Sequence, residues 1–290
     1  MAKPAESVWY LVQDAVDAYW QVLLHPQERK YYCAMLRRPG KKPTFLAYNR
    51  TAQGSRGAPL SWTILYGLIC HLACSTLRCP VTPDSQRMEV YVDDPVCLLL
   101  GTEPECKQQA AIMTLAWAAL GIVLAFAKGQ FGRTVNWIGA SFESTNTGVV
   151  ATILRARLDD LLALVRDLLS ANVASIKKVR TLTGKAQSIA SLLWVWRPFV
   201  HMLYAAIYAP IDPYSVHRPP AGCIWTKQIH VPLRWLVAFL TGRRGNLHRT
   251  LSLESYMRLG KSIVLTTDAS PYGLGAVLTI DGTIAAWFSN

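Results

Sequence analysis

Two adjacent carboxylates, Asp93 and Asp94, stand between two apolar runs of β-favouring residues, 90–92 and 96–100. Such runs around a short polar break predict an antiparallel hairpin with the acids at its tip. Like charges held together repel, and a divalent cation with hard oxygen ligands is their commonest partner. An Asp-rich surface turn is the alternative that this pair alone leaves open, because Asp is a favoured turn residue.

The composition is that of a folded, basic protein. Of 290 residues 51% are hydrophobic and 10 are Trp, which excludes a disordered chain and allows one large domain or two ordinary ones. Lys and Arg number 30 against 18 Asp and Glu, a net charge of +12. This balance points to a polyanionic partner, with nucleic acid ahead of a membrane surface.

The seven cysteines, an odd number, favour a reducing compartment over a disulfide framework. Cys70, Cys74 and Cys79 near His71 suggest a metal cluster only faintly, since no second pair of ligands follows. Buried thiols in an apolar helix are the preferred interpretation. Residues 1–6 lack the apolar core of a signal peptide, so we expect an intracellular, cytoplasmic or nuclear, protein that is not secreted.

Residues 110–127 carry no charge over a length near the lower limit for a membrane span. The stretch is rich in Ala and is interrupted by Thr114 and Gly121. We therefore expect a buried helix that ends near Gly121 and is followed by a strand, with no membrane contact. The alternative, a membrane protein built on this stretch, predicts detergent-dependent solubility.

Periodicity before residue 148 predicts alternating strands and helices. The first strand begins at residue 7 and ends before Asp14. Sheets often present catalytic side chains at such strand ends, but Asp14 is equally suited to cap a helix. The following elements are a hairpin over 28–48 with its tip at 37–42, a helix over 62–77, the acidic hairpin, a helix from 105 and a strand over 135–142. This order is typical of an α+β fold with helices on one face of an antiparallel sheet.

After residue 148 the pattern becomes helical, with expected helices over 158–169, 175–196 and 231–240. The second is basic and would be closed by Arg197 and Pro198; its cations suit phosphate contacts or a solvated face. Residues 263–278 read as a strand, a glycine turn and a strand, and a third strand follows at 284. The predicted domains are 1–148, the helical region 149–209, the linker and basic helical connection 210–260, and the segment 261–290.

Three blocks of the chain, in this order, resemble the palm of a reverse transcriptase from a retroelement. The first is Asp14-Ala15-Val16-Asp17-Ala18-Tyr19, the second runs from Gln53-Gly54 to Pro59, and the third is Tyr91-Val92-Asp93-Asp94. The second block is more similar to eukaryotic retrotransposon polymerases, of long-terminal-repeat or tyrosine-recombinase type, than to retroviral ones. The ordered set is far more specific than any one block.

Three further segments extend the resemblance over nearly the whole chain. Trp137-Ile138-Gly139 is similar to the family's primer-gripping hairpin, and Thr183-Gly184-Lys185 stands where a thumb is expected. Thr267-Asp268-Ala269-Ser270, with Gly273 and Gly275, resembles the opening of the attached ribonuclease H domain. The implied architecture is a polymerase palm with partial fingers, a helical thumb and a truncated ribonuclease H-like β-start.

The resemblance implies an RNA-directed DNA polymerase that joins dNTPs to a primer 3′-hydroxyl. Asp14 and Asp93 would hold two Mg²⁺ ions, for which Mn²⁺ can substitute, with the Ala15 carbonyl assisting and Asp94 as a third acid. The implied nucleotide pocket consists of Ala15, Tyr19, which would exclude a 2′-hydroxyl, Gln53, Gly54 and Lys128. An RNA or DNA template with its primer would contact Trp137, Gly139, Lys177, Lys178 and Lys185.

The chain also departs from the family. Only 13 residues precede Asp14, where the family has its fingers, and Pro95 removes a ladder donor, which an edge strand tolerates. Asp268 is the only acid of the ribonuclease site, so we expect no hydrolysis of an RNA–DNA hybrid. These departures suggest an excerpt of a retroelement polyprotein. The alternative function is a catalytically inactive remnant that at most binds nucleic acid.

Overall fold

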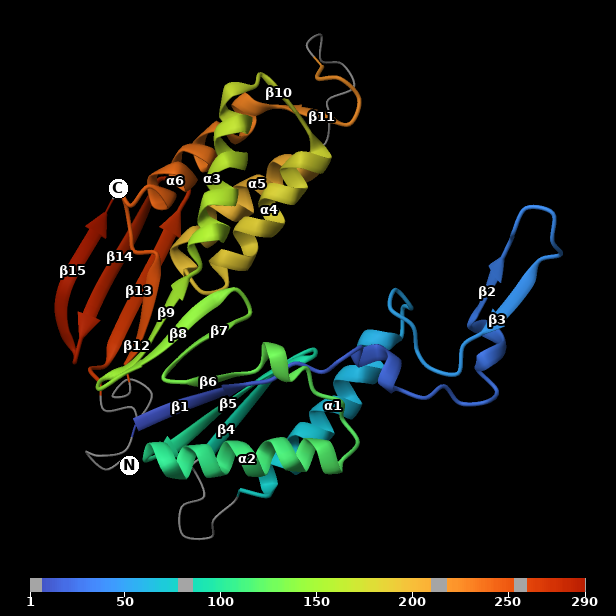
Figure 1. Cartoon of the computed structure of the whole chain (residues 1–290). Coiled ribbons are helices and arrows are strands. Elements are labelled where there is room, and N and C mark those ends of the chain that lie inside the picture. Colours follow the sequence, from blue (N-terminus) through green and yellow to red (C-terminus); the bar gives the residue numbers. More distant parts are fainter. Residues whose placement is uncertain (1–6, 78–85, 210–217, 253–259, 290) are drawn as a thin grey trace. The chain divides into compact units, whose positions relative to one another are not determined.

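The computed structural model describes residues 7–77, 86–209, 218–252 and 260–289 (Figure 1). The chain divides into two compact units, the first formed by 1–144 and 150–249 and the second by 145–149 and 250–290. Cys79 and residues 210–217 of the expected linker lie outside the described residues. Both units contain antiparallel sheets and the first adds helices, which confirms the expected α+β class.

A four-stranded sheet organises the N-terminal part of the first unit. Its order is β4-β5-β1-β6, and neighbouring strands run antiparallel. The strands are β1 (Ser7–Val12), β4 (Gln86–Tyr91), β5 (Asp94–Gly101) and β6 (Gln130–Gly132). Val12 pairs with Val96, so β1 runs out just before Asp14 beside the start of β5.

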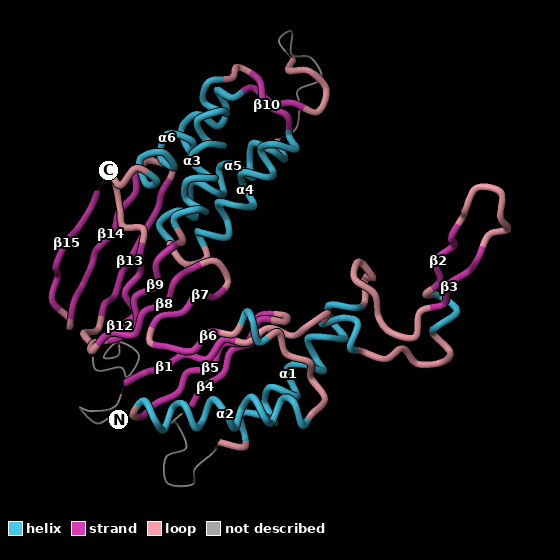
Figure 2. Tube along the Cα trace, in the orientation of Figure 1, coloured by secondary structure: helices cyan, strands magenta, loops and turns pink. Residues whose placement is uncertain are grey.

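Two helices, α1 (Ala58–Ser75) and α2 (Glu103–Ala119), cover one face of this sheet (Figure 2). Leu11, Cys97 and Leu99 alternate towards the helices, as the two-residue period of a strand requires. They meet a helical layer that includes the fully buried Trp62 and Trp117. Helix α1 starts four residues before the predicted position because Pro59, which lacks an N–H, is well tolerated in a first helical turn.

Helix α2 ends where Gly121 predicts, and this expectation is confirmed. Gly121 has φ +83°, and its N–H donates to Ala118 O while that of Ile122 donates to Trp117 O. These two bonds form the glycine-dependent Schellman cap of a helix. The strand expected after it is wrong: residue 124 makes only an isolated bridge to Ala15.

Helix α1, not the stretch 110–127, is the described helix long and apolar enough to cross a membrane. One third of its 18-residue window is buried inside the protein. A helix that packs on a sheet passes the same test, so this finding is weak evidence for a span.

Pro95 lies in β5, which is an internal strand of the sheet and not the edge strand that most easily tolerates a proline. Tyr91 and Asp94 close a two-residue turn and form the hydrogen-bonded pair next to it. Val90 and Pro95 are then a non-hydrogen-bonded pair, and the missing N–H of Pro95 points away from β4. On that side β1 pairs only as far as Val96, so no ladder bond is lost.

The expected hairpin over 28–48 is confirmed as β2 (Cys33–Leu36) and β3 (Thr44–Ala47). The single strand expected over 135–142 is wrong, because β7 (Thr134–Trp137) and β8 (Ala140–Thr145) form a hairpin. Ile138 and Gly139 both have positive φ, +41° and +83°, which is the signature of a type I′ turn. The boundaries between the two units fall within β8, β9 (Gly148–Ile153) and β12 (His248–Ser252).

A helical bundle forms the rest of the first unit, with one core that runs from Ala140 to Leu240. Its helices are α3 (Arg155–Ser170), α4 (Ile176–Ala190), α5 (Arg197–Tyr208) and α6 (His230–Leu240), joined at one end by β10 (Val173–Ser175) and β11 (Cys223–Trp225). Trp196 stacks on Phe239 at 5.5 Å between ring centroids. The core therefore includes α6, on the far side of the expected linker.

The expected helix 175–196 is wrong at its end. Helix α4 stops at Ala190, and a separate 3₁₀ turn, Trp194–Trp196, leads into α5. Pro198 does not close the earlier helix but lies in the first turn of α5, where its missing N–H costs nothing. The helices expected at 158–169 and 231–240 are confirmed as α3 and α6.

The second unit contains a three-stranded antiparallel sheet of β13 (Ile263–Ser270), β14 (Gly273–Ile280) and β15 (Thr283–Ser289). The predicted strand, glycine turn, strand and third strand are confirmed. Asp281 and Gly282, with φ +50° and +79°, make the type I′ turn between β14 and β15. The side chains of β13 and β15 are exposed.

Candidate active site

The acidic hairpin has a two-residue turn, Val92 and Asp93, between β4 and β5. Val92 has φ +59°, a left-handed conformation that is a genuine outlier for a β-branched residue. Such strain costs on the order of 1–3 kcal/mol and persists only where surrounding packing imposes it. Here the Val92 side chain packs against the sheet core, and the half-buried Asp93 and Asp94 follow it at the tip of the hairpin.

Asp14 follows the end of β1 and is held in place by its neighbours on a separate segment. Ala125 N–H donates to Asp14 O at 2.8 Å, and Val16 N–H donates to Val123 O at 2.8 Å. Both bonds bracket the bridge between Ala15 and Leu124, and neither uses the Ala15 carbonyl. The sheet therefore places Asp14 at the same end of the strands as the turn of the acidic hairpin.

The three acids are close enough to affect one another electrostatically. The pKa of Asp94 is raised to about 6, mainly because burial disfavours its charged form and also because Asp14 and Asp93 are negative. A hydrogen bond from the backbone N–H of Ile138 opposes this rise. The carboxyls of Asp14 and Asp93 also act together on the buried Tyr66. Residues 14, 93 and 94 thus lie near enough to one another for their charges to interact.

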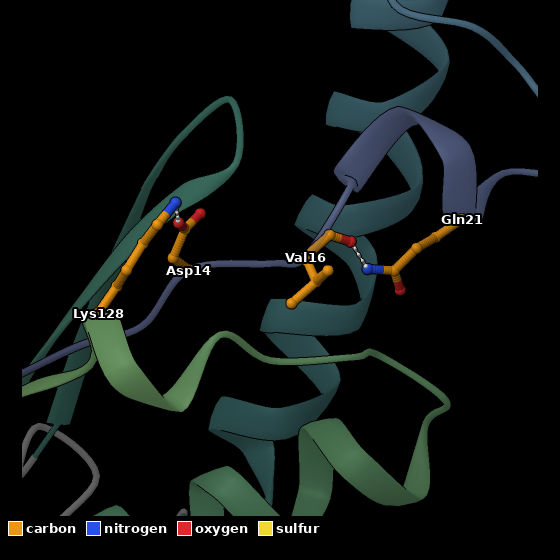
Figure 3. A network of polar contacts seen from close by, with 4 residues as sticks. All are labelled: Asp14, Val16, Gln21 and Lys128. Atoms are coloured by element: carbon orange, nitrogen blue, oxygen red, sulfur yellow. Dashed lines mark hydrogen bonds and ion pairs between the residues drawn. The ribbon is translucent and has the colours of Figure 1, made fainter.

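An ammonium lies on this cluster. Lys128 Nζ is 2.5 Å from Asp14 Oδ2, and Figure 3 shows the two side chains pointing at each other. The bond and the Asp14 charge raise the pKa of Lys128. The resemblance implied a position for Lys128 at the far edge of a nucleotide pocket, whereas it contacts an acid directly. Among the described residues, no three His, Cys, Asp or Glu side chains stand at metal-ligand spacing.

Tyr19 lies on a 3₁₀ turn, Ala18–Gln21, which begins after the left-handed Asp17. Its half-buried ring packs against the sheet core. The Thr51 hydroxyl donates to Tyr19 O, and Arg50 Nη1 donates to Trp20 O at 3.2 Å. Side chains from the loop before α1 therefore fix the backbone that carries Tyr19.

Gln21 fixes the same turn from its other side. Its Nε2 donates to Val16 O at 2.5 Å, as Figure 3 shows, and its Oε1 accepts from Val123 N–H at 3.2 Å. Sequence reasoning missed Gln21, Arg50 and Thr51 because each acts on a backbone group rather than on a motif residue. The closeness of Gln21 to the first block is the only local signal.

Gln53 and Gly54 are exposed in the loop that leads into α1. Gly54 has φ +89°, and a Cβ at this position would meet open space. Glycine is therefore favoured here by the backbone conformation of the turn and not by the close approach of another group. No described hydrogen bond joins Gln53 to the acids. The structure therefore leaves these two residues at a solvent-facing loop of the same unit.

Trp137 contacts the acidic hairpin directly, since its indole Nε1–H donates to Asp94 O at 2.9 Å. This bond joins the β7–β8 hairpin to the backbone of Asp94. Gln130 and Asn136 exchange two hydrogen bonds and secure β7 to β6. The expected gripping hairpin thus lies against a candidate catalytic acid.

Neither family models nor characterised proteins match this sequence significantly. The functional interpretation therefore depends on the geometry of the residues.

The lysines expected to contact nucleic acid lie on α4 and differ in their surroundings. Lys178 pairs with Asp167, and Lys185 lies 3.6 Å from Asp160, both acids of α3. Lys177 is exposed and lines an open depression of about 600 Å³ with Arg180. Lys177 and Arg180 are consequently better placed for a polyanion than the two paired lysines.

Asp268 belongs to the second unit and is exposed on β13. Its Oδ1 accepts a hydrogen bond from Ala269 N–H at 2.9 Å, a local turn-like contact. Of the cysteines near His71, Cys70 is 1% exposed and burial raises its pKa to about 11, as expected for a buried thiol.

Proposed function

We propose that this chain is an RNA-directed DNA polymerase of a retroelement, which transfers dNTPs onto a primer 3′-hydroxyl. The observation that carries the proposal is the meeting of Asp14 with Asp93 and Asp94 from distant parts of the sequence. In this proposal the sheet with α1 and α2 is the palm, and the bundle α3–α6 is the thumb.

The chemistry of the three acids, though not their spacing in this structure, suits divalent ions. Three carboxylates supply hard oxygen ligands, and the pKa of Asp94 is raised mainly by burial and further by the negative charges of Asp14 and Asp93. The ammonium of Lys128 on Asp14 is a cation that the cluster already attracts. Asp14, Asp93 and Asp94 would hold two Mg²⁺, with the unused Ala15 carbonyl available. When bound, these ions supply Lewis acidity and neutralise phosphate charge.

The remaining residues would position the substrates. Tyr19, on its braced turn, would lie beneath the incoming sugar and exclude a 2′-hydroxyl. Gln53 and Gly54 would border the nucleotide. Trp137 and Gly139 would contact the primer end, while Lys177, Lys178 and Lys185 would lie along phosphates. Lysines are assigned to the phosphates and aspartates to the metal ions, because anionic phosphates bind cations while metal ions bind carboxylates.

Primer extension on an RNA template with Mg²⁺ tests the proposal. Asp93→Asn should abolish incorporation, because it removes a ligand charge at the turn. Glu89→Gln is the matched control, since Glu89 is an acid on the same hairpin that pairs with Arg87 and should not be needed. Failure of the unmodified chain to incorporate any dNTP counts against the polymerase.

A catalytically inactive remnant that binds nucleic acid is the second candidate. The observation that favours it is the Lys128–Asp14 pair together with the lack of ligand-spaced acids among the described residues. It predicts duplex binding that weakens steeply with salt, without incorporation. The same two assays, run side by side on one preparation, separate the candidates.

A further inference from the structure

Arg157 on α3 makes three hydrogen bonds that join separate elements. Its Nη1 donates to the carbonyl oxygens of Ile138 at 3.3 Å and Gly139 at 3.1 Å, at the turn between β7 and β8. Its Nη2 donates to Ser188 Oγ on α4 at 2.7 Å. One planar guanidinium therefore links two helices of the bundle to one β-turn.

The turn is shaped to receive this guanidinium. A Cβ at Gly139 would lie 1.7 Å from Arg157 Nη1, a distance that no side chain allows. The positive φ of Ile138 and Gly139 turns both carbonyls towards the same donor. The φ of +83° favours glycine at this turn, and any side chain here would also displace the guanidinium of Arg157 from the two carbonyls.

The other side of the same turn meets a candidate catalytic acid. Trp137, the residue before the turn, donates its indole Nε1–H to the Asp94 carbonyl oxygen at 2.9 Å. Arg157 therefore holds the turn by the Ile138 and Gly139 carbonyls, while the adjacent Trp137 contacts the backbone of Asp94. A movement of α3 or α4 relative to the turn must strain one of these bonds.

We propose that Arg157 is a positioning residue that fixes Asp94 through the 138–139 turn and ties its placement to helices α3 and α4. This inference rests on the proposed function, because Asp94 acts there as a catalytic acid. Arg157 itself touches no reacting atom. Its effect is to hold the turn next to Trp137, whose indole N–H bonds the Asp94 carbonyl oxygen and so positions the backbone that carries the carboxylate.

The link can be observed without any activity in the full chain labelled with ¹⁵N-tryptophan. Of the 10 Trp residues, Trp137 is assigned by the loss of one indole signal in Trp137→Phe. Arg157→Gln should move the Trp137 indole resonance, because the turn is released. Arg155→Gln is the matched control, since Arg155 lies on the same helix and pairs only with Asp159 among its described partners. It should leave the signal in place.

Kinetics test the consequence for the reaction. Arg157→Gln should lower kcat on the order of tenfold to a hundredfold, the effect of a displacement near 1 Å, and leave KM for dNTP unchanged. Arg157→Lys should not restore kcat, because a single ammonium cannot bridge two carbonyls and Ser188 together. Arg155→Gln should retain the activity of the unmodified chain.

The outcomes separate this inference from the proposed function. A chain that incorporates no nucleotide refutes the polymerase, while the indole comparison still tests the link. An unmoved Trp137 signal in folded Arg157→Gln overturns the inference, as does an unchanged kcat in an active chain. If Arg157→Gln does not fold, Ser188→Ala removes one acceptor only and should move the same signal in the same direction by less.

Discussion

At the scale of single residues, the site combines burial of Asp94 with the negative charge of its two neighbouring acids. Asp94 is held partly away from water beside two other acids, and its pKa of about 6 records the cost of charging it. An acid whose pKa is raised by folding binds its proton more tightly in the folded state. Between the unfolded value of 3.8 and about 6, stability therefore falls as pH rises.

Asp94→Asn should consequently stabilise the folded chain at pH 7.5 in the absence of divalent ions. After allowance for solvent screening of this half-buried group, we expect a gain of about 1–2 kcal/mol in the free energy of unfolding. The gain should shrink towards pH 4, where the carboxyl is neutral in the folded state. Urea unfolding at both pH values measures it, with Glu89→Gln as the control. An equal gain in stability at both pH values would contradict the view that it arises from removing the charge of Asp94.

Lys128→Gln should tighten divalent-ion binding, because the ammonium competes for Asp14. Both side chains are in contact with solvent, so the effect should be modest, up to about fivefold. Calorimetric titration with Mn²⁺ measures it. Lys107→Gln, which breaks an exposed ion pair with Glu103 on α2, should leave the Mn²⁺ affinity unchanged. Weaker Mn²⁺ binding by Lys128→Gln would show that the lysine assists the site.

The acids themselves were predictable from sequence, because a strand end and a two-residue hairpin are local patterns. The residues that hold the backbone around these acids were not predictable. Arg157, Gln21 and Arg50 act through carbonyl oxygens that any residue supplies, so no motif marks them. Only the folded backbone shows which carbonyl a distant guanidinium meets.

At the scale of elements, β-turns decide where the site residues lie. The β7–β8 hairpin resembles one strand in sequence because Trp137, Ile138 and Ala140 are apolar or β-favouring. The positive φ of Ile138 is costly for a β-branched residue, and sequence patterns assign it to a strand interior. The hydrogen bond from Arg157 to the Ile138 carbonyl opposes this local preference.

Ile138→Asn tests this conflict. Asn tolerates the left-handed conformation, and the Ile138 side chain is 44% exposed, so little packing is removed. We expect an increase of about 1 kcal/mol in the free energy of unfolding, measured by chemical denaturation. Gly139→Ala should instead destabilise the chain, because alanine is strained at φ +83° and its Cβ would displace the Arg157 guanidinium. A decrease in stability in Ile138→Asn would show that the isoleucine side chain is needed.

At the scale of the whole molecule, sequence reasoning found the fold class and most helices and strands. Helix ends were less predictable: Pro198 opens α5 although the sequence favoured it as the close of α4, since the rule for proline permits either position. The core from residue 140 to 240 was also hidden, because α6 joins it across a long separation in sequence. Periodicity identifies an apolar face but not its partner.

The net charge of +12 predicts salt-dependent binding to an RNA–DNA duplex. Neutralising the exposed Lys177 and Arg180 together should reduce the slope of log K against log salt by roughly 2, one for each phosphate that is no longer neutralised. Neutralising Lys178 and Lys185, which pair with acids of α3, should reduce it less. Fluorescence anisotropy between low and moderate salt measures both. Equal slopes for the two double variants would contradict the distinction.

The tight turn at Val92 and Asp93 has a consequence for how this protein can change over generations. A two-residue connection has no slack, so one inserted or deleted residue in β5 would shift its register by one and exchange its two faces. Cys97 and Leu99 would then leave the core, and the acids would turn away from Asp14. Replacement of side chains remains open to this hairpin, whereas changes of its length do not.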